Sequence, residues 1–211
     1  MPSSRLGRRC VLLALLAAGL LTFGWRAVAA APSADEARGL IEKVSAEVLA
    51  VLSNQALADR QKFDALVELL EGPIDLDLVA RLILGRHWRT ADGTQRQEYL
   101  ALFRDYALAN LAAKLHLYRG QSFEVTGAKV VSDKDALVTS RILSDGEPPL
   151  HVDWRLRQRD GAGPVTIDLI VEGVSLIVTL RSEFASVIER QGFDGLLVEL
   201  RQRITQTRQQ A

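Results

Sequence analysis

Apolar residues recur every three or four positions from residue 33 to about residue 118, a spacing that is typical of amphipathic helices. The first helix is predicted to begin at Ser33, which has Glu36 at the spacing of a capping box. Asp75 is the predicted cap of the third helix, and Thr94 with Gln97 forms the predicted capping box of the fourth. The predicted helices span residues 33–54, 59–71, 75–84 and 94–118.

The hydrophobic period shortens to two residues after Gly120, which predicts a series of β-strands at residues 122–131, 136–143, 150–157 and 165–171. Short polar segments join these strands, so we expect an antiparallel meander. One face of the sheet is expected to be covered and the other to be wet. Alternation places two apolar sets on single faces of the third and fourth strands: Val152, Trp154 and Leu156, and Val165, Ile167, Leu169 and Val171.

The helical period returns from Leu176 onward, is interrupted at Gly192, and starts again with Asp194 as a cap. Gly173 would permit a sharp bend after the fourth strand, and Ser175 would cap the helix that follows. Helices, then a four-stranded antiparallel sheet, then helices that pack back on the sheet predict an α+β fold.

The first 29 residues have the anatomy of a secretory signal peptide and are not expected to belong to the folded domain. Arg8 and Arg9 precede an apolar stretch at residues 11–21, and an A-x-A cleavage signal ends at Ala29. The apolar stretch is shorter than the roughly 20 residues that span a bilayer, which favours cleavage over anchoring. We therefore expect a cleaved signal peptide, residues 1–29, and one exported domain, residues 30–211.

Removal of this leader changes the charge and the chemistry of the chain. Four of the 26 basic residues and none of the 26 acidic ones precede residue 30, so the mature chain would carry a net charge of −4. A chain with this excess of acidic residues does not have the net positive charge that is typical of proteins that bind nucleic acid or an anionic membrane surface. Cys10, the single cysteine, lies in the leader, so the mature domain would lack a disulfide and a cysteine-based metal site.

The polar residues do not indicate catalysis, a metal or a cofactor. None of the three histidines, His87, His116 and His151, is spaced from another ligand residue as a metal site requires. The segment E-G-V-S-L at residues 172–176 resembles a nucleophile elbow but lacks the glycine two positions after the serine. The apolar faces could close on each other as an ordinary core or stay apart around an apolar ligand, because leucine and valine line both.

Several separated motifs resemble the MlaC family, also called the toluene-tolerance family. They are L-G-R-H-W-R at 84–89, Q-R-Q-E-Y at 95–99, F-R-D-Y at 103–106, E-G-V-S-L through R-S-E-F at 172–184, and G-F-D-G-L at 192–196. The resemblance implies a periplasmic phospholipid carrier that binds lipid without chemistry. It implies two partners: an outer-membrane lipoprotein/porin complex and an inner-membrane ABC transporter with an MCE protein. It also implies that the helical layer and the twisted four-stranded sheet enclose a deep apolar pocket.

With this resemblance we expect the lipid tails to contact eleven residues, each of which could equally be a core residue. They are Val79, Ile83, Phe103, Tyr106, Val152, Trp154, Leu156, Ile167, Leu169, Val174 and Leu176. Arg86 and Arg89 could meet the lipid phosphate or an acidic partner, or could be solvated turn residues.

Two other classes of function stay open. An exported α+β domain could bind or convert another small hydrophobic molecule, which would need a polar cluster inside the pocket; Tyr106, Asn110 and Asp168 are the candidates. A structural adaptor would instead have a closed core and no cavity.

Overall fold

The computed structural model describes residues 30–159 and 161–210, so the predicted signal peptide lies outside the described residues. Helices precede and follow an antiparallel sheet, which confirms the predicted α+β fold. The elements are α1 (Ala34–Ser53), α2 (Asp59–Leu70), α3 (Leu76–Leu84), α4 (His87–Thr90), α5 (Gly93–Lys114), the 3₁₀ turn η1 (Leu115–Leu117), β1 (Ser122–Val130), β2 (Asp135–Leu143), β3 (Leu150–Arg159), β4 (Gly163–Val171), β5 (Val174–Ser175) and α6 (Leu176–Gln210).

The helix starts follow from local capping chemistry. The Ser33 hydroxyl accepts a hydrogen bond from the Glu36 amide, and the Glu36 carboxylate accepts one from the Ser33 amide, so the predicted capping box is confirmed. In α5 the box is formed by Asp92 and Gln95, two residues earlier than the predicted pair. An aspartate carboxylate accepts hydrogen bonds from the free amide groups of the first helical turn as well as a threonine hydroxyl does. The sequence therefore contains two competing start positions for α5, Asp92 and Thr94.

The strands follow one another in the order β1-β2-β3-β4-β5, and every neighbouring pair is antiparallel. The predicted meander is therefore confirmed, but the sheet has five strands rather than four. The additional strand, β5, is two residues long and pairs with the end of β4. A strand of this length has no detectable period, and the sequence predicted only a bend and a helix cap there.

A register shift in the middle of β3 and β4 corrects the prediction that the apolar residues of β4 share one face. Leu169 pairs with Trp154, whereas Val165 pairs with Arg157. Residues paired across antiparallel strands have side chains on the same face, and Trp154 and Arg157 point to opposite faces of β3. Val165 therefore faces away from Leu169, because the bulge inserts one residue between them.

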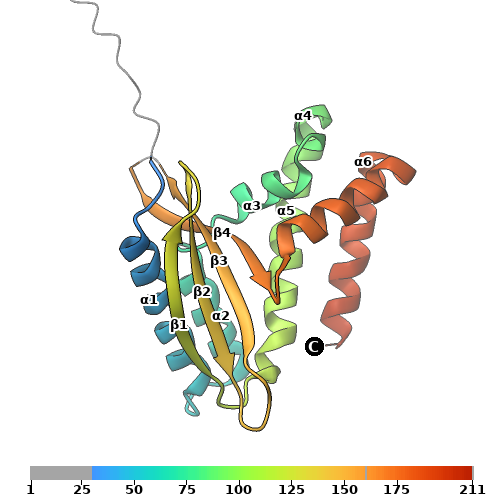
Figure 1. Ribbon diagram of the computed structural model, residues 1–211. Helices are drawn as coiled ribbons and strands as arrows, with labels where there is room; N and C mark the ends of the chain where they lie inside the picture. Colours follow the sequence, from blue (N-terminus) through green and yellow to red (C-terminus); the bar gives the residue numbers. More distant parts are fainter. Residues whose placement is uncertain (1–29, 160, 211) are drawn as a thin grey trace, which may run out of the picture.

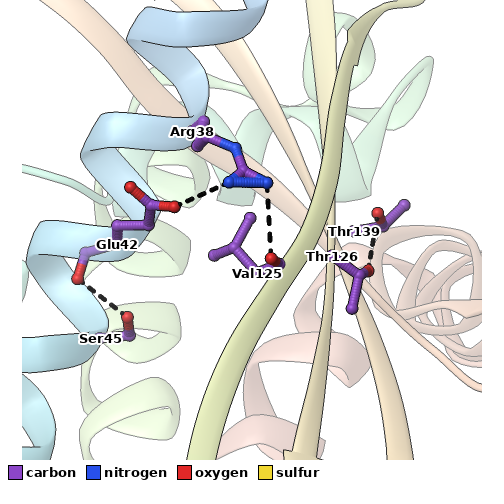
Figure 2. Close-up of polar contacts among 6 residues, drawn as sticks. All are labelled: Arg38, Glu42, Ser45, Val125, Thr126 and Thr139. Atoms are coloured by element: carbon purple, nitrogen blue, oxygen red, sulfur yellow. Dashed lines mark hydrogen bonds and ion pairs between the residues drawn. The ribbon is translucent and has the colours of Figure 1, made fainter.

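A second bulge, in β1, fastens helix α1 to the edge of the sheet (Figure 2). Val125 pairs with Ser140 but Gly127 pairs with Thr139, so Thr126 is the extra residue. Figure 2 shows the Arg38 side chain of α1 directed at the Val125 carbonyl oxygen, and the Thr126 and Thr139 hydroxyls directed at each other. The Arg38 guanidinium donates to the Val125 carbonyl oxygen at 3.4 Å, and the two threonine hydroxyl oxygens lie 3.1 Å apart. Arg38 thus satisfies a carbonyl at the irregular position of an edge strand.

Two separate groups of buried apolar side chains hold the domain together, which is unusual because a small domain normally has one contiguous core. The first, which we call the sheet cluster, joins α1 to the sheet. The second, the helical cluster, joins α3, α5 and α6, which lie beyond the β4 edge of the sheet (Figure 1). The sheet cluster comprises Ala37, Ile41, Ala136, Val138 and Leu156. The helical cluster comprises Ala80, Ile83, Leu84, Tyr99, Phe103, Ile177, Leu180, Phe184, Val187, Leu196, Leu197 and Leu200.

Helix α6 changes direction at Gly192, where the backbone leaves helical geometry with φ 75° and ψ 177°. Residues with a side chain rarely adopt this φ, so glycine is the residue that permits the break. The predicted interruption is confirmed, and it lets both parts of α6 contribute residues to the helical cluster.

Candidate functional site

The sheet face that packs on α1 remains partly open toward β4. Trp154 and Leu169 share this face and are half-buried, whereas Val152 and Leu156 on the same face of β3 are buried. The Trp154 indole N–H donates to the Ser140 hydroxyl oxygen at 2.9 Å, so its polar atom already has a partner within the sheet. Trp154 and Leu169 therefore present apolar surface without an unsatisfied polar group.

Helix α5 is apolar on two opposite sides. Tyr99 and Phe103 belong to the helical cluster. Since each helical residue turns by about 100°, Leu108 lies on the opposite side of α5 from Tyr99, with Leu111 nearby, and both are half-buried. Arg104, on this second side, contacts Glu71 at the end of α2 at 2.5 Å. The second apolar side of α5 is therefore turned toward α2.

The second apolar side of α5 is not among the features predicted from the sequence. The signal was present in the sequence, because Leu108, Leu111 and Leu115 follow one another at helical spacing. When a helix is apolar on two opposite sides, the two sides offset each other in the periodic pattern of apolar residues. A search for one inward face therefore does not detect both.

Half-buried apolar side chains thus come from α2, from α5 and from the sheet. Figure 1 shows α1 and α2 on one side of the strands and α5 beside them, and neither α2 nor α5 packs its backbone closely on a strand. We call the following set the apolar layer: Phe63 and Val67 of α2, Leu108 and Leu111 of α5, and Trp154 and Leu169 of the sheet. It consists of carbon surface that neither hydrophobic cluster buries completely.

The eleven residues predicted to contact lipid tails fall into three groups. Ile83 and Phe103 are buried in the helical cluster, and Val79 and Tyr106 are half-buried against it. Val152, Trp154, Leu156, Ile167 and Leu169 belong to the sheet, and all but Trp154 and Leu169 are buried. Val174 and Leu176 are 61% and 49% exposed and lie outside the apolar layer. The structure therefore does not bring all eleven together.

The two arginines predicted near a headgroup or a partner lie at the far end of the helices. Arg86 precedes α4 and donates to the Glu189 carboxylate of α6 at 2.8 Å, and both side chains are exposed. Arg89 lies within α4, which follows α3 on the side away from the strands (Figure 1). Neither arginine therefore lies near the sheet part of the apolar layer.

The polar groups considered for catalysis have structural partners. The Ser175 hydroxyl donates to the Asp168 carboxylate at 2.5 Å and accepts from the Val178 amide at 3.1 Å, so its predicted role as a helix cap is confirmed. Asp168 also accepts from the Ile177 amide at 3.0 Å. A carboxylate at the first turn of α6 is favourably placed because the amide end of a helix carries a partial positive charge.

Asn110, another of the polar candidates, is engaged within the fold, as is the core residue Tyr99. The Asn110 side-chain amide donates to the Tyr106 carbonyl oxygen one turn earlier at 2.8 Å. The buried Tyr99 hydroxyl donates to the Ala80 carbonyl oxygen at 3.0 Å, and burial raises the pKa of Tyr99. Within residues 30–159 and 161–210 no three potential metal ligands gather, and no helix of this part of the chain could cross a membrane.

A comparison with known proteins identifies the family to which this chain belongs. The family model described as MlaC protein matches residues 42–202, which is most of the chain. The chain belongs to the MlaC family. This confirms the resemblance seen in the sequence motifs.

Individual relatives are distant in sequence. The intermembrane phospholipid transport system binding protein MlaC of Haemophilus influenzae is 22% identical over 137 residues, which are 63% of this chain and 64% of that protein, just under two thirds of its length. The toluene tolerance protein ttg2D of Pseudomonas putida is 26% identical over 188 residues, covering 89% of this chain and 85% of that protein.

A solved structure of a phospholipid-binding protein from Ralstonia solanacearum, in complex with a phospholipid, superimposes with a TM-score of 0.72. The two chains are 24% identical, and the match covers 83% of this chain and 99% of that one. This match supports the fold.

Proposed function

We propose that this chain is a periplasmic carrier that binds a phospholipid without chemical change. In this proposal it moves lipid between an outer-membrane lipoprotein/porin complex and an inner-membrane ABC transporter with an MCE protein. Membership of the MlaC family supports the proposal, as do the names of its relatives, which describe phospholipid transport and phospholipid binding. The signal-peptide pattern of the first 29 residues supports export to the periplasm.

The physical task of such a carrier is to keep acyl chains away from water. A diacyl lipid has about thirty CH₂ groups, each worth roughly 0.8 kcal/mol against water, so unaided transfer between membranes faces a barrier on the order of 20 kcal/mol. A protein lowers this barrier only if it offers apolar surface to both tails. Charged or catalytic groups along the tails would weaken binding, because they would lose their hydration without gaining a partner.

The apolar layer is the observation that carries the proposal. A closed core would bury Trp154 and Leu169 completely, yet both remain half-buried, Trp154 packed against the sheet cluster and Leu169 paired with Trp154 across β3 and β4. Acyl chains placed against these residues, and against Leu108 and Leu111 of α5, would complete their burial. In this arrangement Val152 and Leu156 flank Trp154 on the same face of β3, and Ile167 is buried within β4. Ile83 and Phe103 belong to the helical cluster on the other side of α5, where Val79 and Tyr106 pack against it.

The headgroup is proposed to stay at the surface, since the apolar layer contains no charged residue. Arg86 and Arg89 fit contact with an acidic partner better than contact with the lipid phosphate, because α4 lies away from the strands.

The proposal is tested by transfer of a labelled phospholipid. Donor vesicles that contain a fluorescent phosphatidylethanolamine and its quencher are mixed with acceptor vesicles, with and without the mature protein. We expect the protein to accelerate dequenching by at least tenfold. A rate equal to that of bovine serum albumin at the same concentration would contradict a dedicated carrier function.

A further inference from the structure

Four exposed apolar residues gather around the β4–β5 hairpin. They are Leu150, Val171, Val174 and Leu176, and we call them the hairpin patch. Their exposed fractions range from 40% to 61%, and neither hydrophobic cluster includes any of them. Single exposed apolar side chains are common on proteins, but a group in one place is typical of a binding surface.

The strand register places this patch on one side of the sheet. Val171 pairs with Val174 across the hairpin and with Val152 of β3, so all three side chains share a face. Leu150 lies two residues before Val152 and therefore points to the same side. Leu176 follows β5 directly at the start of α6. Leu150, Val171 and Val174 consequently lie on one side of the sheet, and Leu176 adjoins Val174 in the chain.

Two hydrogen bonds to β3 hold the turn that carries the patch. Glu172 and Gly173 both have positive φ, 47° and 79°, as the central residues of a tight two-residue hairpin turn do. This conformation is unfavourable for a glutamate, but its carboxylate accepts a hydrogen bond from the His151 amide at 2.7 Å. The Glu172 amide in turn donates to the His151 carbonyl oxygen at 3.0 Å. These two bonds fix the exposed valines relative to β3.

The patch also continues the apolar layer toward the surface. Leu169 of the layer precedes Val171 by two residues on β4, and both pair with residues of the same face of β3. If acyl chains lie against Leu169, they are therefore next to the hairpin patch when they enter or leave. This step rests on the proposed carrier function.

Acidic residues accompany the patch. Glu172 lies within the hairpin, and Asp145 and Glu147 lie in the connection that leads to Leu150. An anionic bilayer would repel these carboxylates, whereas lysine and arginine side chains on a protein would attract them. We propose that the hairpin patch docks the partner protein with which this chain exchanges lipid, through a partner surface of apolar side chains flanked by basic ones.

The test uses Leu150→Asp and Leu150→Lys in the mature, phospholipid-loaded protein. Binding to the purified MCE protein and to the purified outer-membrane complex of the same organism is measured by biolayer interferometry. We expect both variants to bind at least one of the two complexes tenfold more weakly or worse. Lipid content should stay at the wild-type level, because Leu150 lies outside the apolar layer. Val198→Asp is the matched control, since Val198 is an exposed valine of α6 outside the patch, and it should bind as the wild type does.

Two results would overturn the docking proposal. One is wild-type binding of both Leu150 variants to both complexes. The other is binding to vesicles of phosphatidylethanolamine and phosphatidylglycerol without any partner protein, weakened by Leu150→Asp and strengthened by Leu150→Lys, which would make the patch a membrane-binding surface. A wild-type protein that carries no lipid would contradict the carrier function instead, and the binding assay would still decide the role of the patch.

Discussion

Replacing Leu169 by aspartate is expected to abolish phospholipid retention in a protein that still folds. Leu169 is half-buried on the sheet face that carries Trp154, so the new carboxyl group would lie within the apolar layer. A carboxylate placed against acyl chains loses its hydration without a partner, and a cost of about 3 kcal/mol already lowers affinity more than 100-fold. Lipid extraction and mass spectrometry of the purified variant should therefore find no more than traces of phospholipid.

The neighbouring residue provides a matched control for this experiment. Ile170 is also half-buried, but it pairs with Ser175 and faces the other side of β4. Ile170→Asp makes the same chemical change one position away, so we expect it to retain phospholipid at the wild-type level. Circular dichroism would establish that both variants are folded. Full retention of lipid by folded Leu169→Asp would show that this strand face does not contact the tails.

Phe184→Ala is expected to have the opposite profile, with a large loss of stability and little change in lipid content. Phe184 is buried in the helical cluster, and its ring meets the Tyr99 ring edge-on at a centroid distance of 6.4 Å. Removing a buried phenylalanine side chain costs about 3–5 kcal/mol, a large part of the roughly 5–15 kcal/mol that stabilises a typical domain. Urea unfolding followed by circular dichroism would measure this loss.

Val198→Ala serves as the comparison for Phe184→Ala because Val198 is an exposed residue of the same helix. Its effect on the free energy of unfolding should stay within about 0.5 kcal/mol. The fraction of Phe184→Ala that remains folded should still hold phospholipid, since the apolar layer lies outside the helical cluster. If Phe184→Ala loses its lipid as completely as Leu169→Asp, the separation into a supporting cluster and a lipid-contacting layer is wrong.

The features that the sequence predicted correctly depend on neighbouring residues. Ser33 and Glu36 cap α1 because their spacing suits mutual hydrogen bonds, and Ser175 caps α6 for the same local reason. The antiparallel meander also follows from short polar connections, since parallel strands need long crossovers. Such features require no knowledge of the rest of the fold.

The features that could not be predicted from the sequence depend on contacts between segments that are distant along the chain. The bulge in β4 separates the faces of Val165 and Leu169, but alternation within a strand contains no sign of one extra residue. Leu108 and Leu111 face α2 because α5 lies between α6 and α2, which the pattern of α5 alone does not determine. Contact of Val174 and Leu176 with the tails stays a prediction, and the exposure of both side chains beside the turn could not be predicted from their apolar character.

Native mass spectrometry of the mature protein, purified from the periplasm of its host, tests the central claim most directly. The carrier account predicts that the folded protein has an excess mass equal to one or more phospholipids, and that organic extraction followed by refolding removes this mass. The delipidated protein should also unfold at a lower temperature and regain its stability when phospholipid is added, because a ligand that binds only the folded state stabilises it. A folded protein with the mass of the polypeptide alone, whose stability does not change on adding phospholipid, would contradict the account.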